Sequence, residues 1–360
     1  MGLNVSRPWL PDWNELGNKL QETWDTGWLT HNGPLVREFE ERLAQLWGVG
    51  NVIVVANGTL AIQLALRALG ASGNVITSPF TWKATATAIV WENLKPVFAD
   101  ISSDNLCLDP EKVEELINEE TGCILPINVY GNPPNFKEFS RISDKYGIPV
   151  VYDAAHAACT KIEGKSCLSF GDISATSFHA TKLIHTAEGG ACITENADLA
   201  DRLRALRFFG FGESDIEPAQ GTNAKMTEIH AAIGLCVLDN LQEIMSIRKE
   251  ICEIYENCLG SSELVKFGNF SSKEFSNNHI YFPIIFNDEE KLEECVELLN
   301  QRDIYPRRYF HPSVNMIEGF IQANCPVSES FSKRVLCLPL SPLMSPEDAH
   351  RVVSSISHIL

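Results

Sequence analysis

The sequence lacks Cys-x-x-Cys pairs, runs of basic residues, and any apolar stretch of the roughly eighteen or more residues that a membrane helix requires. Its eleven cysteines stand singly between Cys107 and Cys337. This spacing argues against a disulfide framework and a structural zinc site, and it is typical of reduced thiols. Residues 1–20 are polar and interrupted by prolines, without the apolar core of a secretory signal. We therefore expect a soluble, cytoplasmic protein with no metal and no membrane partner.

Positive charge is also scarce, with 29 Lys and Arg against 47 Asp and Glu, for a formal net charge of −18. A chain this acidic repels nucleic-acid phosphates, so we expect no nucleic-acid partner. The net charge does not exclude a local pocket that binds a small phosphorylated ligand. Charged residues make up 21% and hydrophobic residues 44%, a globular composition. The length of 360 residues favours two domains, or one large α/β domain with an appendage.

Short apolar runs alternate with helical patterns along the first half of the chain. We expect strands at residues 52–55, 75–77, 96–101, 123–127, 149–153 and 191–194, and helices at residues 35–46, 60–70, 84–90 and 136–146. Strands joined by crossover helices pair in parallel, so this order predicts a parallel sheet covered by helices.

Several residues that could bind a ligand or take part in catalysis follow these strands. Gly58 and Thr59 stand between a strand and a helix, where free N–H groups and the helix dipole bind anions, although this pair is also common as a plain cap. Trp82 follows another strand at the edge where open α/β sheets bind ligands, with a core tryptophan as the alternative. Asp153 ends a buried strand and is placed to reach a ligand, or to act as a capping aspartate.

Lys182 lies between an aromatic, small-residue approach and a Glu-Gly-Gly turn that leads into the strand at 191–194, so we place it on a loop. In a poorly solvated cleft its amine would lose the proton and become a nucleophile toward a carbonyl group. The alternative is a solvated surface lysine. Four tryptophans near the N-terminus allow two further interpretations, either an arm whose aromatic side chains pack on the main body or a loop at a ligand cleft: Trp9, Trp13, Trp24 and Trp28.

Taken in chain order, the motifs resemble the DegT/StrS family of nucleotide-sugar aminotransferases, which use pyridoxal phosphate. They are Gly58-Thr59, Thr81-Trp82, Asp153-Ala154-Ala155-His156, Ser177 and Lys182, with similar segments at 27–34, 221–228, 309–312 and 337–340. The resemblance covers nearly the whole chain. It implies an α/β protein with the aspartate-aminotransferase fold (type I), whose large domain has a mainly parallel, seven-stranded type of sheet. The implied division is an N-terminal arm (1–34) that folds back on the large domain (35–235), and a smaller C-terminal α/β domain (236–360).

The same resemblance implies roles for residues at the cofactor. Lys182 would be the Schiff-base lysine and the proton carrier, and Asp153 would pair with the pyridine nitrogen. Trp82 would stack on the ring, and His156 would lie near the phenolic oxygen. The expected phosphate ligands are Gly58, Thr59 and Ser177 of the same chain and Asn223 of the neighbouring subunit, which implies a homodimer with shared active sites.

Four further residues are carried over as substrate contacts: His185, Lys225, Tyr309 and His311. Lys225 stands where the family often has arginine, and a lysine offers a point charge in place of a bidentate fork. Some relatives have histidine at the position of Lys182 and dehydrate sugars, so the lysine favours amino transfer.

The function implied is transfer of the amino group of L-glutamate to C4 of a nucleotide-linked 4-keto-6-deoxyhexose, with dTDP preferred as the nucleotide. The aminated sugar would serve surface polysaccharide or O-antigen synthesis. Alternatives are a GDP- or UDP-linked sugar, amination at C3, a cysteine desulfurase or pyridoxal-dependent lyase on the same fold, and a non-catalytic regulator. No cysteine lies in a Gly/Ser-rich loop suited to carrying a persulfide, which argues against the desulfurase.

Overall fold

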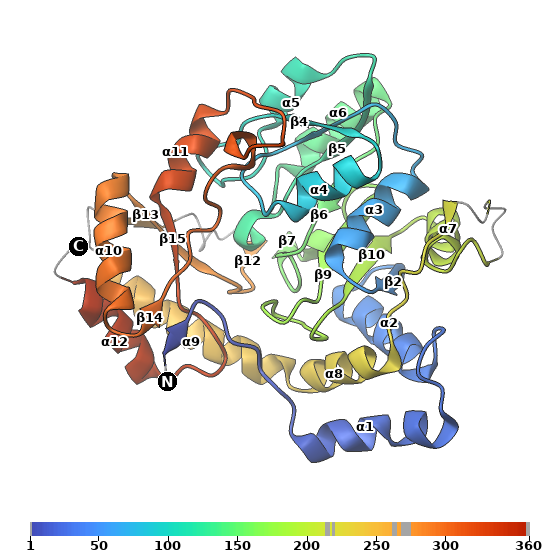
Figure 1. The fold of residues 1–360 in the computed structure, drawn as a ribbon, viewed down its shortest axis with the longest axis horizontal. Helices are drawn as coiled ribbons and strands as arrows, with labels where there is room; N and C mark the ends of the chain where they lie inside the picture. The colour runs from blue at the N-terminus through green and yellow to red at the C-terminus, as the bar shows by residue number, and fades with distance from the viewer. Residues whose placement is uncertain (1, 213–216, 218–219, 261–264, 268–274, 358–360) are drawn as a thin grey trace.

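The computed structural model describes residues 2–212, 217, 220–260, 265–267 and 275–357 (Figure 1). The strands are β1 (Leu3–Asn4), β2 (Asn51–Val55), β3 (Asn74–Thr77), β4 (Lys95–Phe98), β5 (Thr121–Leu125), β6 (Val151–Asp153), β7 (Lys161–Ile162), β8 (Lys165–Ser166), β9 (Ile173–Ser177), β10 (Gly190–Thr194), β11 (Val265–Phe267), β12 (Phe275–Ser276), β13 (Phe282–Phe286), β14 (Ile304–Tyr305) and β15 (Val335–Leu338).

The helices are α1 (Trp13–Thr26), α2 (Pro34–Trp47), α3 (Gly58–Ala68), α4 (Ala84–Trp91), α5 (Pro110–Leu116), α6 (Phe136–Tyr146), α7 (Ala197–Arg207), α8 (Glu228–Asp239), α9 (Leu241–Leu259), α10 (Glu289–Asn300), α11 (Pro326–Arg334) and α12 (Pro346–Ile356). None of these helices, within the described ranges, combines the length and apolar character that crossing a membrane requires.

The central sheet has the mainly parallel, seven-stranded form expected from the sequence. Its two parts have the orders β2-β10-β9-β6 and β4-β3-β5. Parallel bridges between Ile124 and Val150 and between Ile127 and Asp153 join them. Among the described strands of this sheet, only β10 runs antiparallel to its neighbours. The carboxyl ends of the parallel strands therefore meet at one edge, where open α/β sheets bind ligands.

Alternation along each strand divides the core between two faces of this sheet. In β2, Val52 and Val54 pack with side chains of α2, α6 and α8. Ile53 and Val55 point the other way and pack with α3, α4 and α7. Since both faces are covered, residues 52–55 of β2 are all apolar and buried, which is why this strand is a continuous apolar run in the sequence.

The C-terminal part builds a second core of its own. The antiparallel sheet β11-β13-β15 packs against helices α9, α10 and α12. In Figure 1 these elements lie to one side of the large sheet. Helix α9 begins at Leu241, and Asn240 separates it from α8. The domain division near residue 235 stays a prediction.

A third cluster joins the two parts beside the site described below. Phe80 and Tyr130 from the large sheet side pack with Tyr281 and Phe310 from the C-terminal part. The rings of Tyr130 and Phe310 stack with centroids 6.0 Å apart. The C-terminal part therefore supplies one wall next to the carboxyl edge of the parallel strands.

The N-terminal segment contacts both parts of the molecule. Strand β1 pairs in parallel with β14, with Leu3 opposite Ile304. Farther along, Leu16 and Leu20 of α1 pack against the core that includes α8. The arm thus does more than fold back on the large domain, because its first strand belongs to the C-terminal part.

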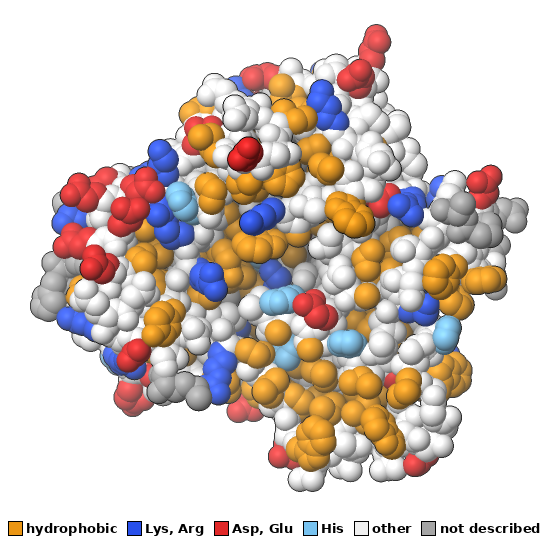
Figure 2. All heavy atoms as spheres, viewed as in Figure 1, with side chains coloured by type: hydrophobic (Ala, Val, Ile, Leu, Met, Phe, Trp, Pro, Cys, Tyr) orange, Lys and Arg blue, Asp and Glu red, His pale blue; other side chains and the backbone are white. Residues whose placement is uncertain are grey.

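The expectation that all four N-terminal tryptophans pack on the main body holds for Trp9, which packs against the core. Trp13 and Trp24 are 80% and 67% exposed, and Trp28 is 44% exposed. Trp13 and Trp24 lie about three turns apart and so share one side of α1, beside the stripe that α8 covers. Figure 2 shows hydrophobic side chains gathered over α1 and α8. None of the four lines the large cavity, so the ligand-cleft interpretation is not supported either.

Candidate active site

A cavity of about 750 Å³ opens at the carboxyl edge of the parallel strands. Figure 2 shows this face hollowed near its centre, with hydrophobic, basic and histidine side chains around the hollow. The walls come from the first turn of α3, from α4, from the ends of β6 and β9, and from the loop between β9 and β10. Tyr281, Tyr309 and Phe310 complete the wall from the C-terminal part.

One end of the cavity is the N-terminus of α3. Asn57 is the N-cap, and its side chain accepts a 2.9 Å hydrogen bond from the amide of Leu60. Gly58 and Thr59 are therefore the first two residues of the helix, and the capping residue is Asn57 instead. Their N–H groups have no acceptor among the described residues. Free amides at the positive end of a helix dipole make this end of the cavity an anion site.

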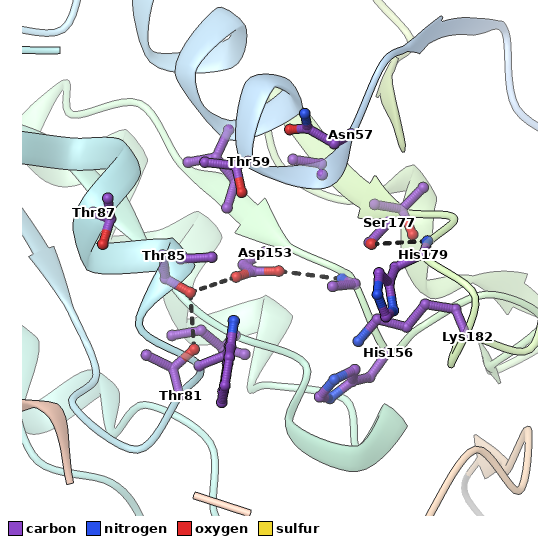
Figure 3. A pocket seen from close by; sticks show the side chains of 18 of the residues that line it. Asn57, Thr59, Thr81, Thr85, Thr87, Asp153, His156, Ser177, His179 and Lys182 are labelled. Atoms are coloured by element: carbon purple, nitrogen blue, oxygen red, sulfur yellow. Dashed lines mark hydrogen bonds between the residues drawn. The ribbon is translucent and has the colours of Figure 1, made fainter. Parts of the chain in front are cut away.

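Two glycines allow the strands to approach this helix end closely. A Cβ atom at Gly58 would lie 2.8 Å from Cβ of Ser177 and 3.2 Å from its Oγ. A Cβ atom at Gly190 would lie 2.7 Å from the nitrogen of Gly58. The absence of side chains at both positions leaves the Ser177 hydroxyl beside the free amides, where Figure 3 shows it together with Asn57 and Thr59.

Asp153 ends β6 in the middle of the cavity and is 7% exposed. Its Oδ2 accepts a 2.7 Å hydrogen bond from Oγ1 of Thr85, and its Oδ1 accepts one of 3.2 Å from the amide of Ala155. Because the Thr85 proton goes to Asp153, the hydroxyl of Thr81 donates to Thr85 at 2.8 Å. Burial raises the pKa of Asp153, while the bonds from Thr85 and Ala155 and the nearby Lys182 lower it. The carboxyl is thus fixed in direction and faces the cavity.

Lys182 lies on the loop between β9 and β10, as the sequence predicts, and it is half-buried at the cavity wall. Burial lowers the pKa of its amine from 10.5 to about 8, against the opposing effect of Asp153. No described hydrogen bond or ion pair holds Nζ. The surface-lysine alternative therefore fails. An amine with this pKa is partly neutral near pH 7 and able to act as nucleophile and base.

His156 lies near Lys182 and is buried beside Tyr281 and Phe310 (Figure 3). Its Nδ1 accepts a 3.2 Å hydrogen bond from the amide of Tyr130. Burial, with a smaller effect of Lys182, lowers its pKa well below 6.5, so the ring is neutral. Since Nδ1 is the acceptor, Nε2 carries the proton and is available as a donor.

Two predicted aromatic residues form the outer wall. Trp82 is 56% exposed, so it is a cavity residue and the core-tryptophan alternative is wrong. Its ring meets that of Tyr309 edge to face at 6.4 Å. Tyr309, half-buried, accepts a hydrogen bond at its carbonyl from the hydroxyl of Tyr130. Both rings offer apolar surface to a planar ligand.

Four predicted residues lie away from this cavity. Asn223 is exposed, and its Oδ1 accepts a 2.5 Å hydrogen bond from Nζ of Lys225. Lys225 lies over the ring of Phe208, 4.4 Å from its centroid. His311 is exposed beside Arg308.

His185 differs from the other three because it is buried, with 2% exposure. Its Nε2 donates a 2.7 Å bond to the carbonyl of Trp9, and its Nδ1 accepts a 3.4 Å bond from the amide of Ala187. Both ring nitrogens are engaged with backbone, so His185 has none left to offer a substrate.

Sequence reasoning missed several residues that line the cavity. Thr85 was within reach, because it follows Thr81 by one helical turn and lies in the predicted helix at 84–90. Asn57 before Gly-Thr is also a usual N-cap signal. Phe310 lies in the segment 309–312, which resembles the family. Tyr281 carries no local signal, since only the packing of the C-terminal part brings it to the site.

The residues present fit the expected pyridoxal phosphate. Free amides of α3 and the Ser177 hydroxyl suit the phosphate. Gly58 and Gly190 let these donors lie close together, and the buried carboxyl of Asp153 suits a protonated ring nitrogen. Lys182 is the amine available to an aldehyde. No cluster of His, Cys, Asp and Glu in the described ranges could hold a metal ion.

Two curated relatives carry the same description, dTDP-4-amino-4,6-dideoxy-D-glucose transaminase. The one from Escherichia coli is 37% identical over 347 residues, covering 93% of each chain. The one from Shigella dysenteriae is 34% identical and covers 99% of this chain and 98% of its own. A third relative, the spore coat polysaccharide biosynthesis protein SpsC of Bacillus subtilis, is 30% identical and covers 95% of this chain and 93% of its own.

Solved structures agree with the fold. The chain superposes on DesI, crystallised in the presence of its TDP-sugar product, with a TM-score of 0.94 and 35% identity over 99% of this chain and 92% of that one. It superposes on Helicobacter pylori PseC, an aminotransferase involved in the biosynthesis of pseudoaminic acid, with a TM-score of 0.90 and 25% identity over 100% and 99%. These matches confirm the predicted type I fold. Since the model of the DegT/DnrJ/EryC1/StrS aminotransferase family matches residues 12–357, the chain belongs to that family and is a pyridoxal-phosphate-dependent sugar aminotransferase.

Proposed function

We propose that the protein transfers the amino group of L-glutamate to the C4 keto carbon of a dTDP-linked 4-keto-6-deoxyhexose, giving a 4-amino-4,6-dideoxysugar. The observation that carries this proposal is the placement of Lys182 and Asp153 on one cavity with free helix amides at its end. Two relatives above 30% identity, described as dTDP-4-amino-4,6-dideoxy-D-glucose transaminases, support the choice of sugar and nucleotide.

When bound, pyridoxal phosphate supplies an aldehyde for an amine and a ring that withdraws electrons from the carbon carrying that amine. The Asp153 carboxylate would hold a proton on the ring nitrogen, with Thr85 and the amide of Ala155 fixing its direction. Lys182 Nζ, partly neutral, would take the proton from Cα of the amino donor and return one at the acceptor carbon.

The remaining residues bind and orient. Amides of Gly58 and Thr59 and the hydroxyl of Ser177 would hold the phosphate. The Nε2–H of His156 would donate to the phenolic oxygen, and Trp82 would cover the ring from the outer side. Packing of the aromatic wall from the C-terminal part would exclude water from the reacting atoms.

We infer that the enzyme acts as a homodimer with shared sites. Asn223 and Lys225 are close together but lie outside the cavity of their own chain, which leaves them free to reach the phosphate or substrate of a second copy. Lys225 would present a single charge and Asn223 an amide. His311, exposed on the C-terminal part, stays a candidate substrate contact across such an interface.

We place the reaction in the cytoplasm and its product in surface polysaccharide or O-antigen synthesis. Eleven free cysteines are compatible with a reducing compartment. The similarity to a spore coat polysaccharide biosynthesis protein supports a role in surface sugars.

A panel of nucleotide-linked keto sugars tests the proposal. The purified protein is incubated with L-glutamate and, in separate reactions, with dTDP-, GDP- and UDP-linked 4-keto-6-deoxyhexoses and a 3-keto isomer, and aminated product is identified by mass and NMR. We expect fastest turnover with the dTDP-linked 4-keto sugar. Preference for another nucleotide or for C3 would reassign the substrate, and a bound cofactor whose absorption does not change with glutamate would favour a regulator.

A further inference from the structure

The loop that carries Lys182 is closed on itself by backbone hydrogen bonds near its two ends. Phe178 donates to the carbonyl of Gly189 at 2.7 Å, and Thr186 donates back to Phe178 at 2.9 Å. Ala180 donates to Ala187 at 2.8 Å. These bonds fix the shape of the loop. They do not fix where its tip lies relative to the rest of the protein.

Two side-chain hydrogen bonds tie the tip to the N-terminal strap, which we define as residues 6–9. Ser6 Oγ donates to the carbonyl of Thr181 at 3.3 Å, one residue before the lysine. His185 Nε2 donates to the carbonyl of Trp9 at 2.7 Å, three residues after it. The lysine is therefore bracketed by two contacts to one segment that lies more than 170 positions earlier in the chain.

The bonds of His185 require one neutral tautomer. Its Nδ1 accepts from Ala187, so Nε2 must carry the proton that Trp9 accepts. Burial lowers the pKa of the ring, the hydrogen bond to Trp9 raises it, and Arg248 and His179 lower it further. Ala187 has a φ of 65°, a left-handed backbone that a residue with a side chain adopts only when its surroundings hold it there. His185 is thus bonded on both sides, to the strap and to the strained turn that closes the loop.

We propose that His185 is a positioning residue. Its hydrogen bond to the carbonyl of Trp9 in the N-terminal strap holds the loop so that Lys182 Nζ points into the cavity. The proposal rests on the proposed role of Lys182 and assigns His185 no contact with substrate. Leu183 and Ile184 are buried next to the lysine, but apolar contacts are non-directional and leave the loop free to shift. The hydrogen bond to Trp9 is directional. Without it the loop would adopt more positions, and Lys182 Nζ would point into the cavity in a smaller fraction of them.

The test compares His185→Asn with His185→Gln in the full-length protein. Glutamine places its NH₂ group near the position of Nε2 and can still donate to Trp9, whereas asparagine is too short. Tyr255→Phe is the matched control, because it removes a buried 2.8 Å hydrogen bond to the carbonyl of Pro339, and Tyr255 packs in the core of the C-terminal part. Each protein is stripped of cofactor, and the rate at which it captures added pyridoxal phosphate is followed by absorbance. Steady-state kcat and KM of the loaded enzymes are then measured.

We expect His185→Asn to slow cofactor capture about fivefold to tenfold, the population effect of one lost buried hydrogen bond. Its kcat should fall by a similar factor with KM for the keto sugar unchanged, and His185→Gln should restore both. Capture at the wild-type rate in His185→Asn, equal losses in the Asn and Gln variants, or an equal loss in Tyr255→Phe would each overturn the inference. A raised KM with normal capture would make His185 a substrate contact.

Cofactor capture needs no sugar, so the two proposals fail separately. If no keto sugar is aminated, the function is reassigned while the capture rates still decide the role of His185. Hydrogen exchange gives a readout that is independent of activity. The amides of Ala180, Lys182 and Thr186 donate hydrogen bonds within the loop. They should exchange faster in His185→Asn than in His185→Gln or in Tyr255→Phe, and equal exchange in all three would contradict the positioning role of His185.

Discussion

Thr85 Oγ1 donates a 2.7 Å hydrogen bond to Asp153 Oδ2, joining the first turn of α4 to the end of β6. A neutral donor fixes the direction of the carboxyl without neutralising it, so the carboxylate keeps its charge for a partner in the cavity. Burial alone raises the pKa of Asp153, and a cationic ring nitrogen beside it would lower that pKa again.

Asp153→Asn should therefore bind pyridoxal phosphate and transaminate poorly. An amide no longer favours a proton on the ring nitrogen, whereas the phosphate contacts are unchanged. We expect kcat to fall about 10²- to 10⁴-fold. Cofactor content by absorbance and turnover with glutamate check this, with Asp144→Asn, the same change at an exposed position of α6, as control. Near-normal turnover would show that this carboxylate has another role.

Lys182→Ala should abolish turnover, because no other described lysine lines the cavity. Borohydride reduction of the cofactor-loaded wild-type protein, followed by peptide mass mapping, should place the pyridoxyl group on Lys182. A label on a different lysine would show that Lys182 is not the residue that binds the cofactor.

The rate at which the cofactor-free protein captures pyridoxal phosphate should rise with pH, with a midpoint near 8. The neutral amine is the nucleophile, and burial lowers the pKa of Lys182 to about 8, so the reactive fraction grows as pH rises through that value and then levels off. At pH 7 about a tenth of the amines are neutral, far more than for an exposed lysine. A midpoint near 10.5, measured by stopped-flow absorbance, would mean that the amine is solvated.

Gly58→Ala should weaken cofactor binding, because the added Cβ would meet Ser177 Cβ at 2.8 Å. The cause would be this contact and not backbone strain, since Gly58 does not have a left-handed backbone. We expect a loss of about 1–3 kcal/mol in binding from this overpacking. Gly17→Ala is the matched control. Its Cβ meets nothing within 4 Å, and inside α1 it should stabilise the protein by about 0.5–1 kcal/mol. Equilibrium dialysis measures the cofactor affinity, and thermal unfolding measures the stability. Unchanged cofactor affinity in Gly58→Ala would mean that the close approach of Gly58 to Ser177 is not needed for cofactor binding.

Mixing Asn223→Ala with Lys182→Ala tests the shared site. Loss of a hydrogen bond to a charged phosphate should cost roughly 1.5–3 kcal/mol, so Asn223→Ala should be poorly active when free cofactor is removed. If each site takes Lys182 from one chain and Asn223 from the other, a mixed dimer has one intact site. Random exchange of subunits should then restore about a quarter of wild-type activity. Activity no higher than that of the two parents would mean that Asn223 serves its own chain.

Local sequence patterns were enough to predict most helices and strands of the large sheet and the order of the motifs. Apolar runs without alternation placed β2, β3, β6 and β10, because both faces of a covered sheet are apolar. Proline and glycine at its two ends bounded α2. The loop position of Lys182 follows from the same local signals, and the family assignment needs only the motifs in order.

Contacts between residues far apart in the chain could not be predicted from these local patterns. It brought Thr85 to Asp153, and it brought Tyr281 to the cavity, which no local pattern signals. The direction of His185 shows the reason most clearly. Its neighbours in sequence suggest a residue of the active-site loop, but its partner is the carbonyl of Trp9, 176 positions away. A hydrogen bond across that distance is set by how the strap and the loop pack, and local preferences do not contain this information.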